Sequence, residues 1–236
     1  MADITAPTSG IVYYTDNLLD EKIMKLCQEQ IKKSGLPIVS VSLQPINFGD
    51  NIVLPLKRSY LTMFKQILAG LEKIQTDIVF LCEHDVLYHP SHFHFQPPRK
   101  DIFYYNQNKW RLRVSDGFLV YHDCKSTSQL CADKKFLIKH YKKRISLVEK
   151  NGFSRKMGFE PGSHNRLERV DDFKSEDWRS EFPNVDVRHG WNLTESRWKI
   201  SEFRNSSQKK VSRSWREANE VPGWGSGKDI INKLKE

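Results

Sequence analysis

Hydrophobic and polar positions along the first half of the chain follow two periods in turn. Short apolar runs at 10–14, 37–43 and 77–82 predict strands, and each ends at polar or turn-forming residues. The stretches 20–33 and 59–74 repeat apolar residues every three or four positions, which predicts amphipathic helices. The resulting β-α-β-α-β order predicts an α/β fold, with an open, mostly parallel sheet and helices on both faces.

The boundaries of these elements carry signals of their own. Asp20 can serve as the N-cap of the first predicted helix, and Gly35 supplies its stop. The apolar run 77–82 is unbroken, as expected for a strand buried on both faces of a parallel sheet. The connection at 44–58 is long, and long loops in compact domains are usually functional.

The second half has weaker patterns. Residues 128–150 place apolar side chains at helical spacing among lysines, which predicts a third long helix. Short strands are predicted at 118–121 and 184–189. The last residues, 226–236, are expected to be a loose tail or a short terminal helix.

Composition excludes several classes of protein. The 236 residues are 38% hydrophobic with a mean hydropathy of −0.62, and no run approaches the roughly 20 apolar residues of a membrane-spanning helix. We therefore expect no membrane insertion. The first ten residues lack the apolar core of a signal peptide, and the four cysteines have no metal-ligand spacing. Together these features predict a cytoplasmic location.

Charge divides the chain after Cys124. Residues 1–124 hold 13 basic and 13 acidic side chains, whereas residues 125–236 hold 25 basic and 16 acidic ones, a net charge of +9. Five of the six tryptophans also lie in the second half. A basic region with aromatic residues suits a polyanion such as DNA, and a solvated basic face is the alternative. Since no linker or repeat separates the halves, we expect one domain over 1–236.

The strongest local signal is an acidic triplet. The predicted strand 77–82 runs directly into Glu83-His84-Asp85, where ligands bind in open α/β sheets. Two carboxylates so close together repel each other unless a cation compensates, so the triplet indicates a metal site. A second basic signal, Lys57-Arg58, precedes a predicted helix N-terminus and suits a phosphate, with an ordinary surface pair as the alternative.

The order of elements and the triplet resemble a known family. A β-α-β-α-β half that ends in an apolar strand and an Asp-X-Asp-type triplet looks like the nucleotide-sugar-binding half of GT-A glycosyltransferases. The segment Phe80-Leu-Cys-Glu-His-Asp-Val-Leu-Tyr-His-Pro-Ser-His-Phe93 is also similar to base J-associated DNA glucosyltransferases and related phage proteins. The resemblance covers roughly residues 8–125, and the first acid of the triplet is Glu instead of Asp.

This resemblance implies a GT-A-like fold, a sugar-nucleotide donor such as UDP-glucose, and Mn²⁺ or Mg²⁺ as cofactor. Asp85 would bind the metal, with His189 as a late ligand in preference to His164, and Glu83 would face the ribose or the donor sugar. The remaining residues that it implies for substrate binding are Tyr14, Thr15 and Asp16 for the nucleobase and Lys57 and Arg58 for phosphate.

An inverting reaction would further need a carboxylate that takes the acceptor proton. Asp116 and Glu160 are the candidates because each lies beside glycines in a predicted loop. A retaining reaction would not need this carboxylate base. The resemblance and the basic second half together favour a hydroxymethylated pyrimidine in DNA as acceptor, in a host cytoplasm if a phage encodes the chain.

Other interpretations remain open. The acceptor could be a glycan or a protein. The chain could instead be a metal-dependent hydrolase or nuclease, or a non-catalytic nucleic-acid-binding module. The histidines that follow strand 77–82 are dense enough to suggest zinc, although Pro90 prevents two of them from lying on one helical face: His84, His89, His92 and His94.

Overall fold

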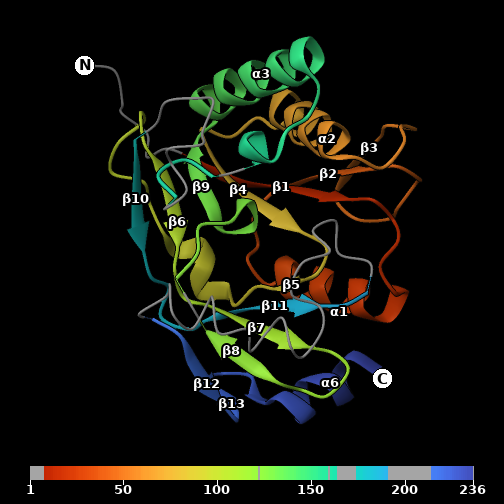
Figure 1. Cartoon of the computed structure of the whole chain (residues 1–236), viewed down its shortest axis with the longest axis vertical. Coiled ribbons are helices and arrows are strands. Elements are labelled where there is room, and N and C mark those ends of the chain that lie inside the picture. The colour runs from red at the N-terminus through yellow and green to blue at the C-terminus, as the bar shows by residue number, and fades with distance from the viewer. Residues whose placement is uncertain (1–7, 122, 159, 164–173, 191–213, 236) are drawn as a thin grey trace.

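The computed structural model describes residues 8–121, 123–158, 160–163, 174–190 and 214–235, and it confirms the predicted order of the first half (Figure 1). Its first elements are β1 (Ser9–Thr15), α1 (Glu21–Lys32), β2 (Ile38–Ser42), β3 (Asp50–Val53), α2 (Tyr60–Lys73) and β4 (Ile78–Glu83). Asp20 caps α1 as expected, since its side chain accepts hydrogen bonds from the backbone of Lys22 and Ile23. The predicted loop 44–58 contains a short edge strand, β3, which its few apolar residues did not indicate.

These strands belong to a seven-stranded sheet with the order β10-β6-β9-β4-β1-β2-β3. The members from the second part of the chain are β6 (Phe103–Asn106), β9 (Leu130–Asp133) and β10 (Ser175–Trp178). All neighbours pair in parallel except β9, which is antiparallel to both β4 and β6. The expected open, mostly parallel sheet is therefore confirmed.

Helices cover both faces of this sheet (Figure 1). On one face, Val12 and Leu81 pack against α2 and against α3 (Lys134–Asn151). On the other face, Ile11 and Phe80 share a core with Ile31 of α1. Successive strand residues thus point alternately into two apolar layers. Because both faces of β4 are buried, its sequence is an unbroken apolar run.

The start of the third long helix was predicted wrongly. Residues 127–129 form a 3-10 turn, η2, and residues 130–133 form β9; only then does α3 begin, capped by Asp133, whose side chain accepts a hydrogen bond from the backbone of Phe136 at 3.0 Å. The strand fills the position between β4 and β6. Pairing with neighbours on both sides outweighs the local helical pattern there.

A second sheet of five strands has the order β12-β8-β7-β11-β5. Its strands are β5 (Val86–Leu87), β7 (Lys109–Arg113), β8 (Leu119–Tyr121), β11 (Asn184–Arg188) and β12 (Arg216–Ala218), and β8 and β11 confirm the two predicted short strands. One face of this sheet carries Leu112, Val185 and Val187 and packs against α1 and α6 (Gly227–Lys235). The chain end therefore forms a terminal helix, the second of the two expected alternatives.

The remaining described elements are small. Two-residue strands β13 (Glu220–Val221) and β14 (Gly225–Ser226) pair with each other, and 3-10 turns form η1 (Pro90–His94) and η3 (Arg155–Gly158). Within the described residues, no helix has the length and apolar character needed to cross a membrane.

Candidate metal and substrate site

The candidate site lies where the carboxyl ends of β1 and β4 meet. The two strands are parallel neighbours, and their register places Tyr14 beside Glu83. His84 and Asp85 form the turn between β4 and β5. Because β5 pairs with β11 and the Val187 amide donates to the Asp85 carbonyl at 2.8 Å, the end of β11 lies against this turn.

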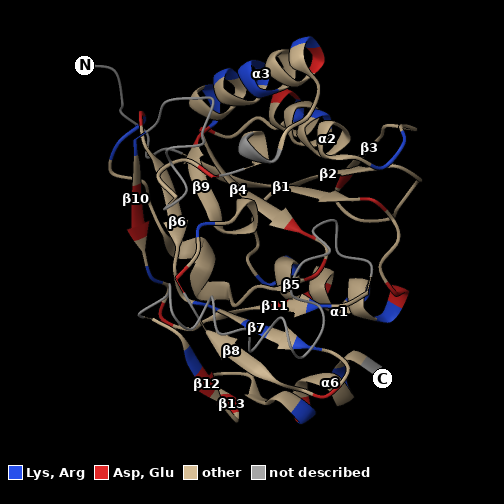
Figure 2. Cartoon of the chain, viewed as in Figure 1, with Lys and Arg blue, Asp and Glu red and all other residues tan. Residues whose placement is uncertain are grey.

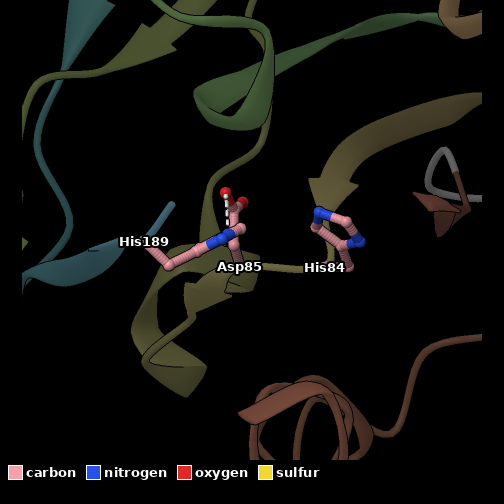
Figure 3. Close-up of side chains that lie close together, drawn as sticks. All are labelled: His84, Asp85 and His189. Atoms are coloured by element: carbon pink, nitrogen blue, oxygen red, sulfur yellow. Dashed lines mark ion pairs between the residues drawn. The ribbon is translucent and has the colours of Figure 1, made fainter. Parts of the chain in front are cut away.

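Asp85 and His189 come together at this junction. The Nε2 atom of His189 lies 3.4 Å from Oδ2 of Asp85, and both side chains are buried. Within the described residues, His84, Asp85 and His189 are the one group of histidines and acids whose ligand atoms all lie within 4.8 Å of one another (Figure 3). Two imidazoles and a carboxylate are a donor set that fits a divalent transition ion, including the Mn²⁺ implied by the resemblance.

The local electrostatics keep these groups in forms that can bind a metal. Burial alone would raise the pKa of Asp85, but the hydrogen bond from His189 and nearby positive charge, including that of Arg188, outweigh it and lower the pKa to about 2. Burial also lowers the pKa of His84, so its ring is neutral at pH 7. An ionised carboxylate and a neutral imidazole are the forms that coordinate metal ions.

Glu83 behaves differently from Asp85. Burial, reinforced by the nearby charge of Asp85, raises the pKa of Glu83 to about 8, although the hydrogen bond from Tyr14 works against this rise. The Tyr14 hydroxyl donates to Oε1 of Glu83 at 2.6 Å. Two carboxylates one residue apart therefore differ in protonation near neutral pH, and only Asp85 is fully ionised in the metal-free protein.

Two further residues at the end of β1 contact the middle of the triplet. Oγ1 of Thr15 lies 2.6 Å from Nδ1 of His84, and Oδ1 of Asp16 lies 3.7 Å from the same nitrogen. Arg58 in turn donates from Nε to Oδ2 of Asp16 at 2.5 Å. The structure thus brings Arg58 to the site through Asp16, while Lys57 is exposed on the preceding loop.

The two candidate bases lie outside the metal-ligand cluster. Asp116 is in the turn between β7 and β8, where Arg113 donates to it at 2.8 Å and the Phe118 amide donates at 3.2 Å. Glu160 is 5% exposed and accepts hydrogen bonds from three side chains: Tyr105 at 2.8 Å, Thr127 at 2.9 Å and Arg144 at 3.3 Å.

Sequence reasoning missed a group of charged residues on the second sheet. They alternate along β7 and β11 on the face opposite the apolar one, and all are largely buried: Lys109, Arg111, Asp186 and Arg188. The Asp186 carboxylate lies 3.6 Å from Nζ of Lys109, 3.9 Å from Nε of Arg111 and 3.5 Å from a terminal nitrogen of Arg188. We refer to these four residues as the cationic face.

The cationic face acts on the acidic triplet. The charge of Asp186 raises the pKa of Glu83 and that of Lys109 lowers it by a smaller amount, while the charge of Arg188 helps to lower the pKa of Asp85. The sequence does contain a signal for the cationic face. In Lys109-Trp-Arg-Leu-Arg113, charged and apolar residues alternate with the period of a strand, which places the charged ones on one face.

The four histidines considered for zinc do not form a site within the described residues, where the ligand cluster includes His84 alone of the four. His92 is fully buried, and burial lowers its pKa to about 3. The side-chain amides of Asn106 and Asn184 lie 3.0 and 3.1 Å from its Nδ1, so it is part of a buried polar network. His164, the less favoured late ligand, lies outside the described residues.

Comparison with known proteins gives structural likeness only. No protein-family model matches the chain, and no curated protein matches its sequence. The structure is similar to that of a glycosyltransferase involved in the glycosylation of the major capsid of PBCV-1, with 12% identity, a TM-score of 0.45, and coverage of 72% of this chain and 82% of that one.

A second similar structure is the apo-form glycosyltransferase GlyE in Streptococcus pneumoniae TIGR4, with 14% identity and a TM-score of 0.40. The match covers 72% of this chain and 45% of GlyE, so the chain spans less than half of that protein. Likeness at this level leaves the function to be argued from the residues of this chain.

Proposed function

We propose that the protein is a metal-dependent glycosyltransferase that moves a sugar from a nucleotide-sugar donor to a hydroxyl acceptor. The observation that carries the proposal is the meeting of Asp85 and His189, 3.4 Å apart, at the carboxyl edge of an open, mostly parallel α/β sheet. Ligands bind outside this edge in such sheets, and a carboxylate with an imidazole suits a divalent ion there.

In this proposal Asp85 and His189 hold Mn²⁺ or Mg²⁺, which would supply positive charge for the leaving diphosphate. Glu83 faces the ribose or the donor sugar, because its carboxyl group lies beside the metal ligands and is held by Tyr14. The end of β1, with Tyr14, Thr15 and Asp16, lines the nucleobase side of the site. UDP-glucose is the default donor.

Two sets of cations are available for the donor phosphates. Lys57 and Arg58 were expected from sequence, and the Arg58 guanidinium contacts Asp16. Lys109 is buried and the Arg188 side chain is 16% exposed; both lie near the acidic triplet and both contact Asp186. We favour Lys109 and Arg188, since they lie near the proposed metal ligands and are less exposed than Lys57 and Arg58, and charge interactions strengthen as solvent is excluded.

For an inverting reaction, Asp116 is the proposed base, and Glu160 is the less favoured candidate because Arg144, Tyr105 and Thr127 already hold its carboxylate. The acceptor is proposed to be a hydroxymethylated pyrimidine in DNA, with a glycan or a protein acceptor as the alternative. Support for a polyanion comes from exposed lysines along α3, a helix on which Figure 2 marks several Lys and Arg positions in blue: Lys135, Lys139 and Lys143. DNA binding that weakens steeply with added salt would agree with this acceptor, and binding that is insensitive to salt would exclude it.

The function is tested by turnover. Purified protein is incubated with radiolabelled sugar nucleotides, with Mn²⁺ or with a chelator, and with DNA that contains hydroxymethylated pyrimidines or with glycans. We expect metal-dependent sugar transfer or donor hydrolysis that Asp85→Asn abolishes and that the exposed control Asp101→Asn retains. Cleavage of DNA or of a phosphoester without any sugar nucleotide would instead identify a hydrolase.

A further inference from the structure

The middle residue of the acidic triplet has a place in the metal site that the Asp-X-Asp-type pattern does not assign to it. We propose that His84 is a third protein ligand of the metal, and that Thr15 and Asp16 hold its ring in the orientation for binding. This inference deepens the proposed function and rests on it in one respect, namely that Asp85 and His189 hold the ion.

The first argument is the spacing of the donor atoms. Metal–ligand bonds of about 2.1 Å place neighbouring donors about 3.0 Å apart in an octahedron and about 3.4 Å apart in a tetrahedron. The separation of 3.4 Å between Oδ2 of Asp85 and Nε2 of His189 equals the tetrahedral distance between donors. The His84 donor atom lies within 4.8 Å of both. Small side-chain rotations therefore suffice to bring all three donors onto one ion.

The second argument is the direction of the His84 ring. One ring nitrogen faces Asp85 and His189, and the other points away from them (Figure 3). The nitrogen in contact with β1 is Nδ1, which lies 2.6 Å from Oγ1 of Thr15. Nε2 is thus the atom directed at the cluster.

The third argument is the support behind the ring. Metal-binding histidines almost always donate their other ring N–H to an oxygen atom, which fixes the tautomer and the ring orientation. Thr15 and Asp16 place two oxygens at 2.6 and 3.7 Å from Nδ1, and Arg58 holds Asp16 in turn. A proton on Nδ1 leaves the lone pair of Nε2 free for the metal.

Three protein ligands with two imidazoles change the expected metal. Imidazole nitrogen suits first-row transition ions, whereas Mg²⁺ prefers oxygen donors and retains its water. The site should therefore prefer Mn²⁺, Co²⁺ or Zn²⁺ to Mg²⁺. Coordination by His84 also gives Asp16 and Arg58 a positioning role, because they hold the His84 ring, in addition to any contact with the donor.

The test uses metal ions alone, without any nucleotide. Calorimetric titration of the metal-free full chain with Mn²⁺ and Co²⁺ should show a dissociation constant that rises at least about 10- to 100-fold in His84→Ala and in His84→Gln, because even the loss of a partner behind a metal ligand has an effect of this size. The Gln variant retains a polar side chain toward Thr15. A melting temperature in chelator equal to that of the wild type shows that each variant is folded. The exposed histidine of η1 supplies the matched control, His94→Ala, which should bind as the wild type does. Asp16→Asn should weaken binding about tenfold.

Pulsed EPR of bound Mn²⁺ gives a readout that a purely structural role of His84 would not change. We expect couplings to two imidazole nitrogens in the wild type and to one in His84→Gln. Unchanged metal affinity together with one imidazole coupling in the wild type would overturn the inference. If Asp85→Asn and His189→Ala weaken Mn²⁺ binding while both His84 variants do not, this inference fails alone; if none of the four affects it, the proposed metal site fails as well.

Discussion

The Nε2 atom of His189 lies 3.4 Å from Oδ2 of Asp85, and the antiparallel pairing of β5 with β11 is what brings them there. Asp85 directly precedes β5, and His189 directly follows β11. Since a shift of one residue in a strand register turns every side chain to the opposite face, the two ligands depend on this pairing. Two halves of the chain therefore contribute to one site.

The protonation of Glu83 predicts how stability depends on pH. Its pKa is raised to about 8 from 4.5, so the folded state binds this proton more tightly than the unfolded state. The resulting stabilisation is complete below about pH 4.5 and is lost as the pH rises through about 8. Asp85 does not titrate in this window because its pKa is lowered to about 2.

Glu83→Gln should abolish this pH dependence. Unfolding by urea in the presence of chelator, from pH 5 to pH 9, should show that the variant gains stability relative to the wild type as the pH rises. The difference should reach a few kcal/mol, since each pKa unit corresponds to about 1.4 kcal/mol. Parallel pH curves for the two proteins would show that Glu83 ionises normally.

Lys109 should contribute more to donor binding than to folding. Its charge is buried, but the two arginines of the cationic face still neutralise Asp186 when the lysine is replaced. Lys109→Met should therefore melt close to the wild type, while its dissociation constant for UDP with Mn²⁺ rises about 10- to 100-fold, as expected for a charged hydrogen bond. The control is Lys100→Met on an exposed loop. Equal UDP affinity in the two variants would remove Lys109 from the site.

Glu160 is predicted to act mainly on stability. It is the acidic partner of Arg144, which is 1% exposed, and it also accepts hydrogen bonds from Tyr105 and Thr127. Glu160→Gln should lower the free energy of unfolding by about 3 kcal/mol, because it removes the charge that neutralises a buried arginine. The surface variant Glu149→Gln should change it by less than about 0.5 kcal/mol.

Turnover per folded molecule distinguishes this role from catalysis. We expect kcat of Glu160→Gln to stay within a few-fold of the wild type. A loss of 10²-fold or more without loss of stability would make Glu160 the base. The same assay on Asp116→Asn tests the other candidate.

Helix α2 approaches the sheet closely at Gly70. A Cβ atom there would lie 2.5 Å from Cγ1 of Val12 and 3.2 Å from Cγ2 of Val41. Overpacking costs about 1–3 kcal/mol, whereas alanine in a helix gains about 1 kcal/mol over glycine. Gly70→Ala should thus destabilise the protein by up to about 2 kcal/mol in urea unfolding, and Gly158→Ala, with more space, should be nearly neutral. A stabilised Gly70→Ala would show that this contact relaxes at little cost.

The elements of the first half could be predicted because their signals are local. Asp20 and Ser59 cap their helices, and β4 reads as buried because it lies between other strands. The strand at 130–133 could not be found in this way, since it depends on partners that lie far away in the sequence. Its residues alone continue the pattern of α3.

The site was predictable in part for a similar reason. Asp85 follows the most evident strand, and His189 follows a recognisable one. Arg58 was expected to bind phosphate, but its closest partner, Asp16, comes from another element. The cationic face was missed because charged residues in a short strand normally indicate solvent exposure. Only the fold shows that Lys109 and Arg111 are buried.

The most direct test of the central claim is calorimetric titration of UDP, GDP, CDP and TDP into the protein with Mn²⁺, with Mg²⁺ and with chelator. We predict that one nucleotide binds in a metal-dependent manner, that Asp85→Asn loses this binding, and that Asp101→Asn retains it. If no nucleotide binds with either metal, or if Asp85→Asn binds as tightly as the wild type, the metal-dependent glycosyltransferase is contradicted.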